Sequence, residues 1–165
     1  MTSYIEIHHI PCQACLSPRI FGDRYKCLEC ENYDLCDGCF NQRRETDNHR
    51  SGHVMVYFSD RDEIFGEPMI NTPHVMSLNN FKAKYASEEH TGFQCNECQL
   101  VPIKGLRFKC NVCDTYDLCI TCMEKGTHDR THTLLAIGKC QFSKITMSDI
   151  KHISELGRGS FGKNY

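Results

Sequence analysis

Cysteine and histidine residues occur in a pattern that repeats once along the chain. Each copy contains three Cys-x2-Cys pairs followed by two histidines spaced as His-x3-His, and the pairs use twelve of the thirteen cysteines. Thiolate sulfur and imidazole nitrogen are the donors that structural zinc binds, four at a time in a closed tetrahedron. Because each copy offers eight donors, the pattern predicts two zinc sites per copy, and therefore four zinc ions per chain.

The candidate ligands form two sets of eight. They are Cys12, Cys15, Cys27, Cys30, Cys36, Cys39, His49 and His53 in the first copy, and Cys95, Cys98, Cys110, Cys113, Cys119, Cys122, His128 and His132 in the second. The six cysteines repeat at an offset of 83 residues, whereas the second pair of histidines comes four residues early. This repeat indicates a duplicated fold, with a shorter loop before the last two ligands of the second copy.

The spacing leaves open which ligands share an ion. In sequential pairing, the first four cysteines of a copy hold one ion, and the last two cysteines hold the other with the histidines. In a cross-brace, the first and third cysteine pairs share one ion, and the second pair shares the other with the histidines. Both arrangements satisfy the four-ligand requirement of zinc.

Zinc is a better explanation for these thiols than disulfide bonds. The chain begins without a basic segment followed by an apolar one, so we expect no secretory signal and a reducing location in the cytoplasm or nucleus, where paired thiols hold metal. A module of about 45 to 50 residues gains little net folding free energy from its hydrophobic core, so it needs additional stabilisation such as bound metal. No apolar run reaches the roughly 18 residues of a membrane helix.

The charge of the chain argues against nucleic acid as a partner. Lys and Arg together number 19, against 21 Asp and Glu, so there is no excess of positive charge to neutralise a phosphate backbone. We therefore expect a protein or peptide partner, and neither nucleic acid nor a membrane.

The elements that must position the ligands are short. Gly22 and Gly105 permit a turn before the second cysteine pair, so we expect a two-stranded hairpin to deliver it. The Leu-Cys-x-x-Cys run that follows predicts the first turn of one short helix, with Asp34 or Asp117 as its cap. Each module is thus predicted to be a small α+β unit.

Aromatic and basic residues also recur in both copies. We expect four aromatic side chains to fill the module cores, namely Tyr25, Tyr33, Phe108 and Tyr116. Arg24 and Arg107 are expected to lay their stems over such rings while their charged heads stay in water.

The predicted organisation has five parts. They are a lead-in (1–7), the first module (8–58), a linker (59–89), the second module (90–137) and a tail (138–165). The linker lacks sustained periodicity apart from one predicted short helix over residues 77–86. A linker of this kind permits either independent or jointly oriented modules.

Several short sequence motifs resemble those of the ZZ-type zinc finger. They are Gly-x-Arg-Tyr-Lys-Cys, Tyr-Asp-Leu-Cys and the closing His-x3-His, and the resemblance covers about 100 of the 165 residues. It implies two cross-braced zinc fingers with short antiparallel strands and one short helix each. The ligand sets it implies are Cys12, Cys15, Cys36, Cys39; Cys27, Cys30, His49, His53; Cys95, Cys98, Cys119, Cys122; and Cys110, Cys113, His128, His132.

The resemblance also implies a protein-interaction function. Some ZZ fingers enclose a free N-terminus or a basic first residue in an acidic pocket, and the acidic candidates for partner binding here are Asp34, Asp114 and Asp117. The other acidic or amide positions of that pocket hold Gln13, Leu16 and Asn32 in the first copy, and Asn96, Gln99 and Thr115 in the second. The alternative role for Asp34 and Asp117 is structural, as helix caps or as partners of a zinc knuckle.

The tail contains a second resemblance. Gly157, Gly159 and Gly162 follow Glu155-Leu156 in a pattern similar to the glycine-rich, nucleotide-covering loop that opens a protein kinase domain. The rest of such a domain is absent, so we expect no enzyme activity from this chain, although a longer form would be a kinase. A glycine-rich tail without function is the alternative, and Cys140 is expected to be a plain residue. A ubiquitin-pathway adaptor is a third reading, weakened because RING domains place a histidine among the middle ligands.

Overall fold

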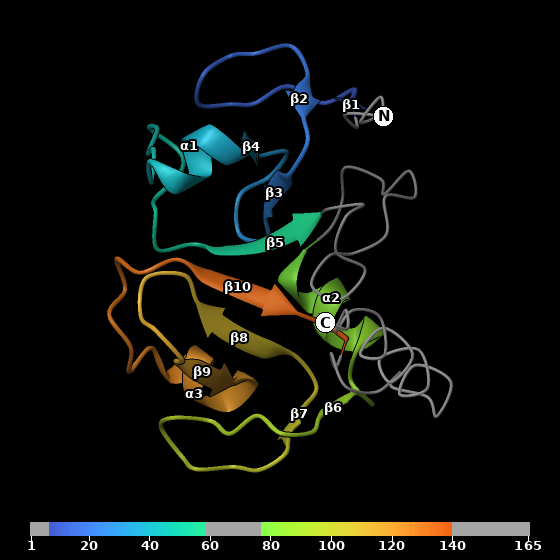
Figure 1. Ribbon diagram of the computed structural model, residues 1–165, viewed down its shortest axis with the longest axis vertical. Helices are drawn as coiled ribbons and strands as arrows, with labels where there is room; N and C mark the ends of the chain where they lie inside the picture. The colour runs from blue at the N-terminus through green and yellow to red at the C-terminus, as the bar shows by residue number, and fades with distance from the viewer. Residues whose placement is uncertain (1–6, 59–76, 140–165) are drawn as a thin grey trace, which may run out of the picture.

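The computed structural model describes residues 7–58 and 77–139, which form two small fingers joined through one sheet (Figure 1). The tail that carries Cys140 and the three kinase-like glycines lies outside the described residues, as does most of the linker. The fold is the zinc-stabilised α+β arrangement that the cysteine pattern predicted.

The first finger begins with a two-stranded ladder of β1 (Ile7–His8) and β2 (Ile20–Phe21). Gly22 then takes a φ of 75° and turns the chain into β3 (Arg24–Cys27), as predicted. Strand β3 pairs with β4 (Asp34–Cys36) on one side and with β5 (Val54–Phe58) on the other. Helix α1 (Asp37–Asn41) follows β4 directly, so the third cysteine pair spans a strand end and a helix start.

The second finger repeats this plan. Its ladder is β6 (Glu89–His90) with β7 (Ile103–Lys104), and Gly105 turns the chain with a φ of 73°. Strand β8 (Arg107–Cys110) pairs with β9 (Asp117–Cys119) and with β10 (Leu134–Ile137). Helix α3 (Ile120–Lys125) ends at Gly126, which adopts the left-handed conformation usual for that position.

The two fingers share a six-stranded sheet in the order β4-β3-β5-β10-β8-β9. Strands β5 and β10 form its parallel centre, with Leu134 paired to Val54 and Leu135 paired to Met55. Leu134 and Met55 hold equivalent places in the two fingers, since each lies opposite the first cysteine of the second pair. In the parallel pairing, however, Leu134 lies opposite Val54 and not opposite its equivalent Met55, so the register is shifted by one residue. Neighbouring residues of a strand point to opposite faces of the sheet. The shift therefore places equivalent side chains on opposite sheet faces, and the two fingers are flipped relative to each other. The sequence left open whether the two fingers are independent or jointly oriented, and the structure shows that they are jointly oriented.

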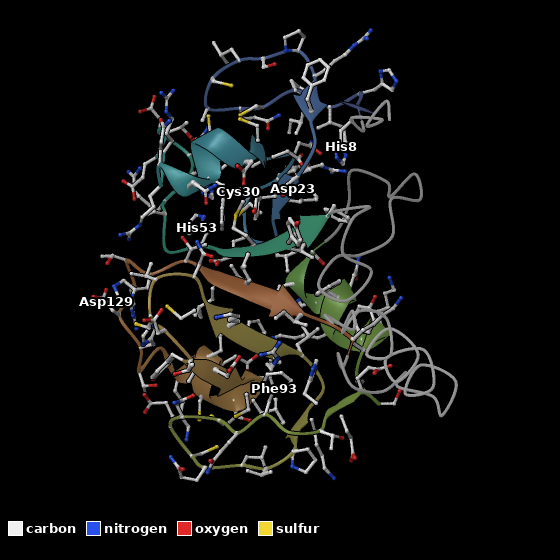
Figure 2. All side chains as sticks on the ribbon, viewed as in Figure 1. His8, Asp23, Cys30, His53, Phe93 and Asp129 are labelled. Carbon is white, nitrogen blue, oxygen red and sulfur yellow. The ribbon has the colours of Figure 1, made fainter. Side chains whose placement is uncertain are left out.

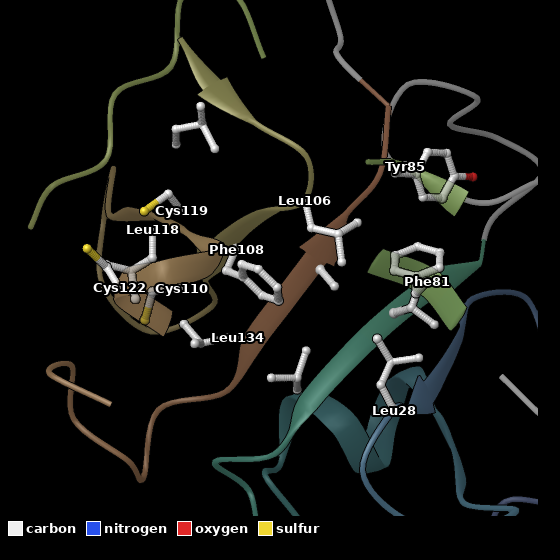
Figure 3. Packing of buried hydrophobic residues seen from close by; sticks show 14 of the residues in the cluster. Leu28, Phe81, Tyr85, Leu106, Phe108, Cys110, Leu118, Cys119, Cys122 and Leu134 are labelled. Carbon is white, nitrogen blue, oxygen red and sulfur yellow. The ribbon is translucent and has the colours of Figure 1, made fainter. Parts of the chain in front are cut away.

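Strand β5 is apolar on both faces because it serves both fingers. Val54, Val56 and Phe58 pack into a cluster with second-finger residues, whereas Met55 belongs to the core of the first finger. Helix α2 (Leu78–Lys84) closes the larger cluster with Phe81, and Tyr85 follows the helix into the same core (Figure 3). The short linker helix predicted over 77–86 is thus confirmed, and it packs on the junction between the fingers.

Two local predictions were wrong. Helices α1 and α3 are capped by Cys36 and Cys119, whose side chains make no capping hydrogen bond, and not by Asp34 or Asp117. The aspartates instead form ion pairs with the preceding strand. Their arginine partners are buried, not hydrated: Arg24 is 5% exposed and Arg107 only 1%.

The predicted aromatic positions do fill the cores. Tyr25, Tyr33 and Phe108 are buried, and Tyr116 is half-buried against the larger cluster. Tyr25 stacks on Phe40 of α1 with ring centroids 3.7 Å apart. These rings attach the short helix and the hairpin to each other where the aliphatic core is thin.

Candidate metal centres and binding pocket

The structure brings the sixteen candidate ligands together as four groups. In each group the donor atoms all lie within 4.8 Å of one another. The groups are Cys12, Cys15, Cys36 and Cys39; Cys27, Cys30, His49 and His53; Cys95, Cys98, Cys119 and Cys122; and Cys110, Cys113, His128 and His132. These are the cross-braced sets, in which each bound ion would tie the hairpin to a distant part of its finger.

The donor spacing fits a tetrahedral zinc ion. Zinc-to-sulfur bonds of about 2.3 Å put neighbouring sulfurs about 3.8 Å apart at the corners of a tetrahedron. The Sγ atoms of Cys15 and Cys36 lie 4.0 Å apart, and those of Cys98 and Cys119 lie 3.7 Å apart. In the mixed groups, His53 Nδ1 lies 3.1 Å from Cys30 Sγ, and His132 Nδ1 lies 3.3 Å from Cys113 Sγ. The four groups fit two zinc ions in each finger.

Backbone amides support the first cysteine of each knuckle as a thiolate. The N–H groups of Glu29 and Cys30 donate to Cys27 Sγ at 3.4 and 3.2 Å, and those of Val112 and Cys113 donate to Cys110 Sγ at 3.3 and 3.2 Å. Such donors satisfy a negatively charged sulfur, which is the form that binds metal.

Burial and backbone donors oppose each other at these thiols. Burial alone would raise the pKa of Cys12, but donors that include the N–H groups of Cys15 and Cys36 outweigh it and lower that pKa to about 7. The pKa of Cys95 falls to about 7 for the same reason. At Cys27 burial dominates and raises the pKa to about 12. A thiol of that kind is protonated without a cation beside it, so zinc must displace its proton.

An aromatic ring supports one histidine ligand in each finger. Tyr33 stacks on His49 with centroids 4.1 Å apart, and Tyr116 stacks on His128 at 4.2 Å. Burial, together with the neighbouring His53, lowers the pKa of His49 to about 4, which keeps the imidazole neutral and able to bind metal. His8 lies outside the four groups, and its Nε2 contacts the carbonyl oxygen of Gly22 at 2.7 Å.

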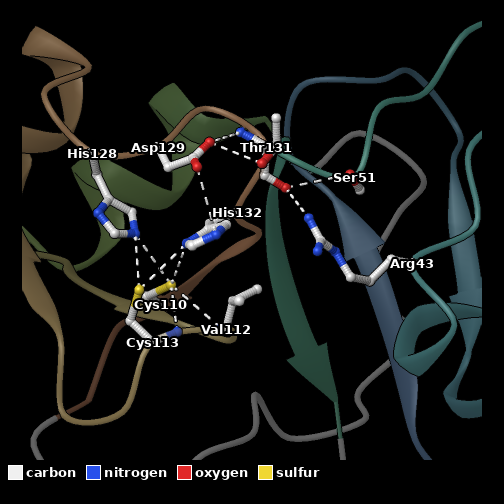
Figure 4. A network of polar contacts seen from close by, with 9 residues as sticks. All are labelled: Arg43, Ser51, Cys110, Val112, Cys113, His128, Asp129, Thr131 and His132. Atoms are coloured by element: carbon white, nitrogen blue, oxygen red, sulfur yellow. Dashed lines mark hydrogen bonds and ion pairs between the residues drawn. The ribbon is translucent and has the colours of Figure 1, made fainter.

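The last zinc group is linked to the junction between the fingers. Asp129 Oδ2 lies 3.7 Å from His132 Nε2, and Asp129 Oδ1 accepts hydrogen bonds from the backbone and hydroxyl of Thr131 (Figure 4). The Thr131 carbonyl in turn accepts from Arg43 and Ser51 of the first finger. A carboxylate behind a ligating imidazole fixes its orientation, so this chain of contacts couples the metal centre to the interface.

A pocket of about 460 Å³ lies on the second finger, and none of the sixteen candidate zinc ligands is among its lining residues. Its lining residues are Gly92, Phe93, Gln94, Asn96, Gln99, Arg107, Lys109, Thr115 and Asp117. Phe93, labelled in Figure 2, comes from the loop before the first cysteine pair, and the Arg107 guanidinium lies 3.7 Å from its ring centroid. Arg107 also donates to Asp117 Oδ1 at 2.6 Å.

The candidate partner-binding aspartates have different surroundings. Asp117 lines this pocket and is half-buried, whereas Asp34 is 1% exposed and Asp114 is exposed but does not line the pocket. A cavity on the first finger includes Glu29, Glu31 and Asp47 but also the candidate ligands Cys30 and His53, so part of its volume belongs to a metal site. Sequence reasoning missed Phe93 and Lys109, whose only signal is a position beside the cysteine pairs.

None of the helices within residues 7–58 and 77–139 is long and apolar enough to cross a bilayer.

Comparisons with known proteins agree with the geometry. The family model "Zinc finger, ZZ type" matches residues 7–51 and 89–133. The autophagy receptor Nbr1 of Schizosaccharomyces pombe is 37% identical over 128 residues, which cover 76% of this chain and 30% of that protein. The histone acetyltransferase HAC12 of Arabidopsis thaliana is 29% identical over 161 residues, covering 74% of this chain and 9% of that protein. The chain thus spans less than a third of either relative.

A solved structure of the HERC2 ZZ domain in complex with a SUMO1 tail is 40% identical, covering 33% of this chain and 95% of that one at a TM-score of 0.32. The two family matches together take up more than half of the sequence. The second match contains both Cys/His groups of its finger, and the first match contains those of the other finger except His53. The chain therefore belongs to the ZZ-type zinc finger family.

Proposed function

We propose that this chain is a zinc-stapled protein-interaction module whose second finger binds an exposed peptide segment of a partner. The sixteen clustered cysteines and histidines hold four structural zinc ions in this proposal. Each ion has four protein donors, so it has no open position for a substrate or water. The metal therefore shapes the fingers and leaves recognition to the surface.

One observation carries the proposal, namely that an aspartate and a lysine line a pocket in the second finger, whereas their equivalents in the first finger are buried. Asp117 and Lys109 line that pocket, whereas the equivalent Asp34 and Lys26 are each 1% exposed and form an ion-pair contact of 3.9 Å. A concave site with a few convergent polar groups is the usual form of a ligand site. Nbr1, whose match covers 76% of this chain, is an autophagy receptor, which supports a binding role.

An exchange between the two fingers tests the pocket. Leu16 and Gln99 occupy equivalent positions after the first cysteine pair, and both have a φ of 62°. Gln99→Leu removes an amide from the pocket but should preserve the fold, because leucine already occupies the equivalent position at 80% exposure. Against an immobilised library of protein tails, we expect Gln99→Leu to weaken binding at least threefold, as losing one or two hydrogen bonds would do.

The matched control is the reverse change in the first finger. Leu16→Gln should leave binding to the same library unchanged. If Leu16→Gln altered binding and Gln99→Leu did not, the recognition surface would lie on the first finger and the proposal would be overturned.

A second candidate function concerns the tail. Gly157, Gly159 and Gly162 match the nucleotide-covering loop of protein kinases, so a longer form of this protein would be a kinase with the two fingers as a regulatory segment. The genomic sequence downstream of Tyr165 tests this directly. A strand lysine, a catalytic-loop aspartate and an Asp-Phe-Gly motif are expected there, and an immediate stop codon would rule the kinase out.

A third candidate is a ubiquitin-pathway adaptor in the cytoplasm or nucleus. The E3 ubiquitin-protein ligase HERC2 of Homo sapiens is 48% identical over 44 residues, but these cover 27% of this chain and 1% of that ligase. A match confined to one finger supports a shared recognition module and leaves ligase chemistry to other domains. Co-purification with ubiquitin-loaded conjugating enzymes is the test, and its absence would remove this candidate.

A further inference from the structure

The pocket of the second finger is unlike an acidic site because its lining has more positive than negative charge. Arg107 and Lys109 contribute two cations, Asp117 contributes one anion, and the remaining lining residues are neutral. Positions that the ZZ resemblance associates with acidic or amide groups hold Asn96, Gln99 and Thr115. An ammonium group entering this pocket would meet a net positive surround.

The one carboxylate of the pocket already has a cationic partner. Arg107 donates to Asp117 Oδ1 at 2.6 Å, and the side chain of Arg107 is 2% exposed, so this pair is held within the protein. An incoming amine would have to share Asp117 with a buried guanidinium. The carboxylate is therefore better suited to neutralising Arg107 than to binding a second cation.

Lys109 is the charged pocket residue that has no ion-pair partner among the described residues. In the first finger the equivalent Lys26 lies 3.9 Å from Asp34, inside the protein. In the second finger Lys109 is half-buried at the pocket wall and forms no ion pair with any described residue. Its cross-strand neighbour Asp117 is paired with Arg107, so among the described residues no carboxylate forms an ion pair with the Lys109 ammonium, and Lys109 lines a cavity of about 460 Å³.

Neutral amides complete the wall and hold one another in place. Gln94 Nε2 donates to Gln99 Oε1 at 2.5 Å, and Gln99 Nε2 donates to the Asn96 carbonyl at 2.9 Å. Asn96 Oδ1 accepts from the Asp117 backbone at 2.8 Å. This network presents a fixed polar wall without adding negative charge, and the Phe93 ring supplies an apolar surface beside it.

From this arrangement we propose that the second-finger pocket binds the carboxylate of an acidic side chain in a partner peptide, with Lys109 as the residue that selects for it. The inference rests on the proposed function and specifies its ligand. The peptide's aliphatic stem lies against Phe93, its carboxylate pairs with Lys109, and a free amino terminus is disfavoured.

Titration of the zinc-loaded chain with four tetrapeptides, followed by amide NMR shifts of the pocket residues, tests this. The first is acetylated, amidated Gly-Glu-Gly-Gly, and the second is its Gln counterpart. The third is the Gln peptide with a free C-terminus, and the fourth is the Gln peptide with a free amino group. We expect the Glu peptide to bind tightest, and Lys109→Gln to weaken it about fivefold, as for loss of a partly screened ion pair.

Lys125→Gln is the matched control, because it removes an equal charge from an exposed position of the second finger outside the pocket. It should leave the affinity for the Glu peptide unchanged. Tighter binding of the free-amine peptide or of the free C-terminus would overturn the proposal, as would equal effects of the two lysine variants. Binding of the free-amine peptide at the pocket would still uphold peptide recognition, so the two proposals fail separately.

Discussion

The two fingers have the same metal scaffold but differ around one equivalent ion pair. In the first finger Asp34 is enclosed by Arg24 at 2.7 Å and Lys26 at 3.9 Å. In the second finger Asp117 keeps the arginine, but its side chain is 13% exposed at the wall of a pocket. A closed zinc site contributes folding free energy on the order of 10 kcal/mol, so residues around it can differ between the two copies without loss of the fold. The first finger buries this ion pair, whereas the second finger has it at the wall of a pocket.

The central strands of the shared sheet differ in a related way. Strand β5 of the first finger is apolar on both faces and contributes Val54, Val56 and Phe58 to the larger core. From β10 that core receives Leu134 and Ala136, while Leu135 packs against the core of the first finger. The first finger therefore acts as a scaffold for the second, and unfolding of either finger should destabilise the other.

Removing zinc from one finger should have the largest effect. Cys27→Ser and Cys110→Ser each remove one ligand from a mixed site, and a closed structural site contributes on the order of 10 kcal/mol. We expect the altered finger to unfold and the other to lose amide protection in β5 or β10. Hydrogen exchange of the zinc-loaded variants is the measurement, and full protection of the unaltered finger would show that the two fold independently.

The sequence could predict each finger because its information is local. Cysteine spacing defines the donors, and Gly22 and Gly105 take the left-handed turns that their position implied. The pairing of β5 with β10 could not be predicted, since it depends on contact between segments about 80 residues apart. The one signal was the continuous apolar run from Val54 to Phe58, which is typical of a strand buried on both faces.

The candidate pocket was harder to predict than the metal groups. Asp34 and Asp117 belong to the same Tyr-Asp-Leu-Cys motif, yet Asp34 is buried and Asp117 lines a cavity. That difference depends on which side chains cover the aspartate, and Lys26 and Lys109 are identical in type. Motif matching therefore predicts the fold of both fingers and misjudges the surface of one.

Neutralising Asp34 should lower the free energy of unfolding more than neutralising the equivalent Asp117. Asp34→Asn leaves Arg24 and Lys26 buried without a carboxylate, and breaking a buried pair in this way costs about 3–5 kcal/mol. Asp117→Asn should cost about 2 kcal/mol, because one hydrogen-bonded charge is lost at a partly exposed place. Urea unfolding of the zinc-loaded variants compares them, with the exposed Asp114→Asn as control. A greater loss for Asp117→Asn would contradict the comparison.

Gly52 tests the docking of the two fingers more directly. A Cβ at this position would lie 1.6 Å from the Arg130 carbonyl oxygen and 2.7 Å from its carbon, so Gly52→Ala must push the loops apart. We expect the variant to lose about 3 kcal/mol, the upper range for overpacking. Gly38→Ala is the control, because a Cβ there meets nothing within 4 Å.

The readout for Gly52 is the relative orientation of the fingers from residual dipolar couplings. In the variant the couplings of each finger should still fit its own structure, but a single alignment tensor should no longer fit both. The hydrogen bonds that join Ser51 and Arg43 to Thr131 would be lost with it. If one tensor continued to describe both fingers, the contact between Gly52 and Arg130 would not be what holds them together.

The smallest expected effect concerns acid sensitivity of the second finger. Burial, followed by the nearby Arg107, lowers the pKa of His90 to about 4, and His90 Nε2 contacts the Gly105 carbonyl at 3.0 Å. An unfolded histidine has a pKa near 6.5, so between about pH 6.5 and 4 the unfolded chain binds a proton that the folded chain excludes. Stability contributed by the neutral form is therefore complete above that window and falls as the pH drops through it, by about 1 kcal/mol between pH 6.5 and 5.5.

His90→Gln isolates this contribution from acid release of zinc. Glutamine keeps an N–H that can reach the Gly105 carbonyl but has no proton to gain in this range. Protonation of zinc ligands affects both proteins equally, so it cancels when their unfolding free energies are subtracted at each pH under saturating zinc. The difference should shift in favour of the variant as the pH falls below 6.5. If the two stability profiles stayed parallel down to pH 5, burial of neutral His90 would not be a source of the acid sensitivity of this finger.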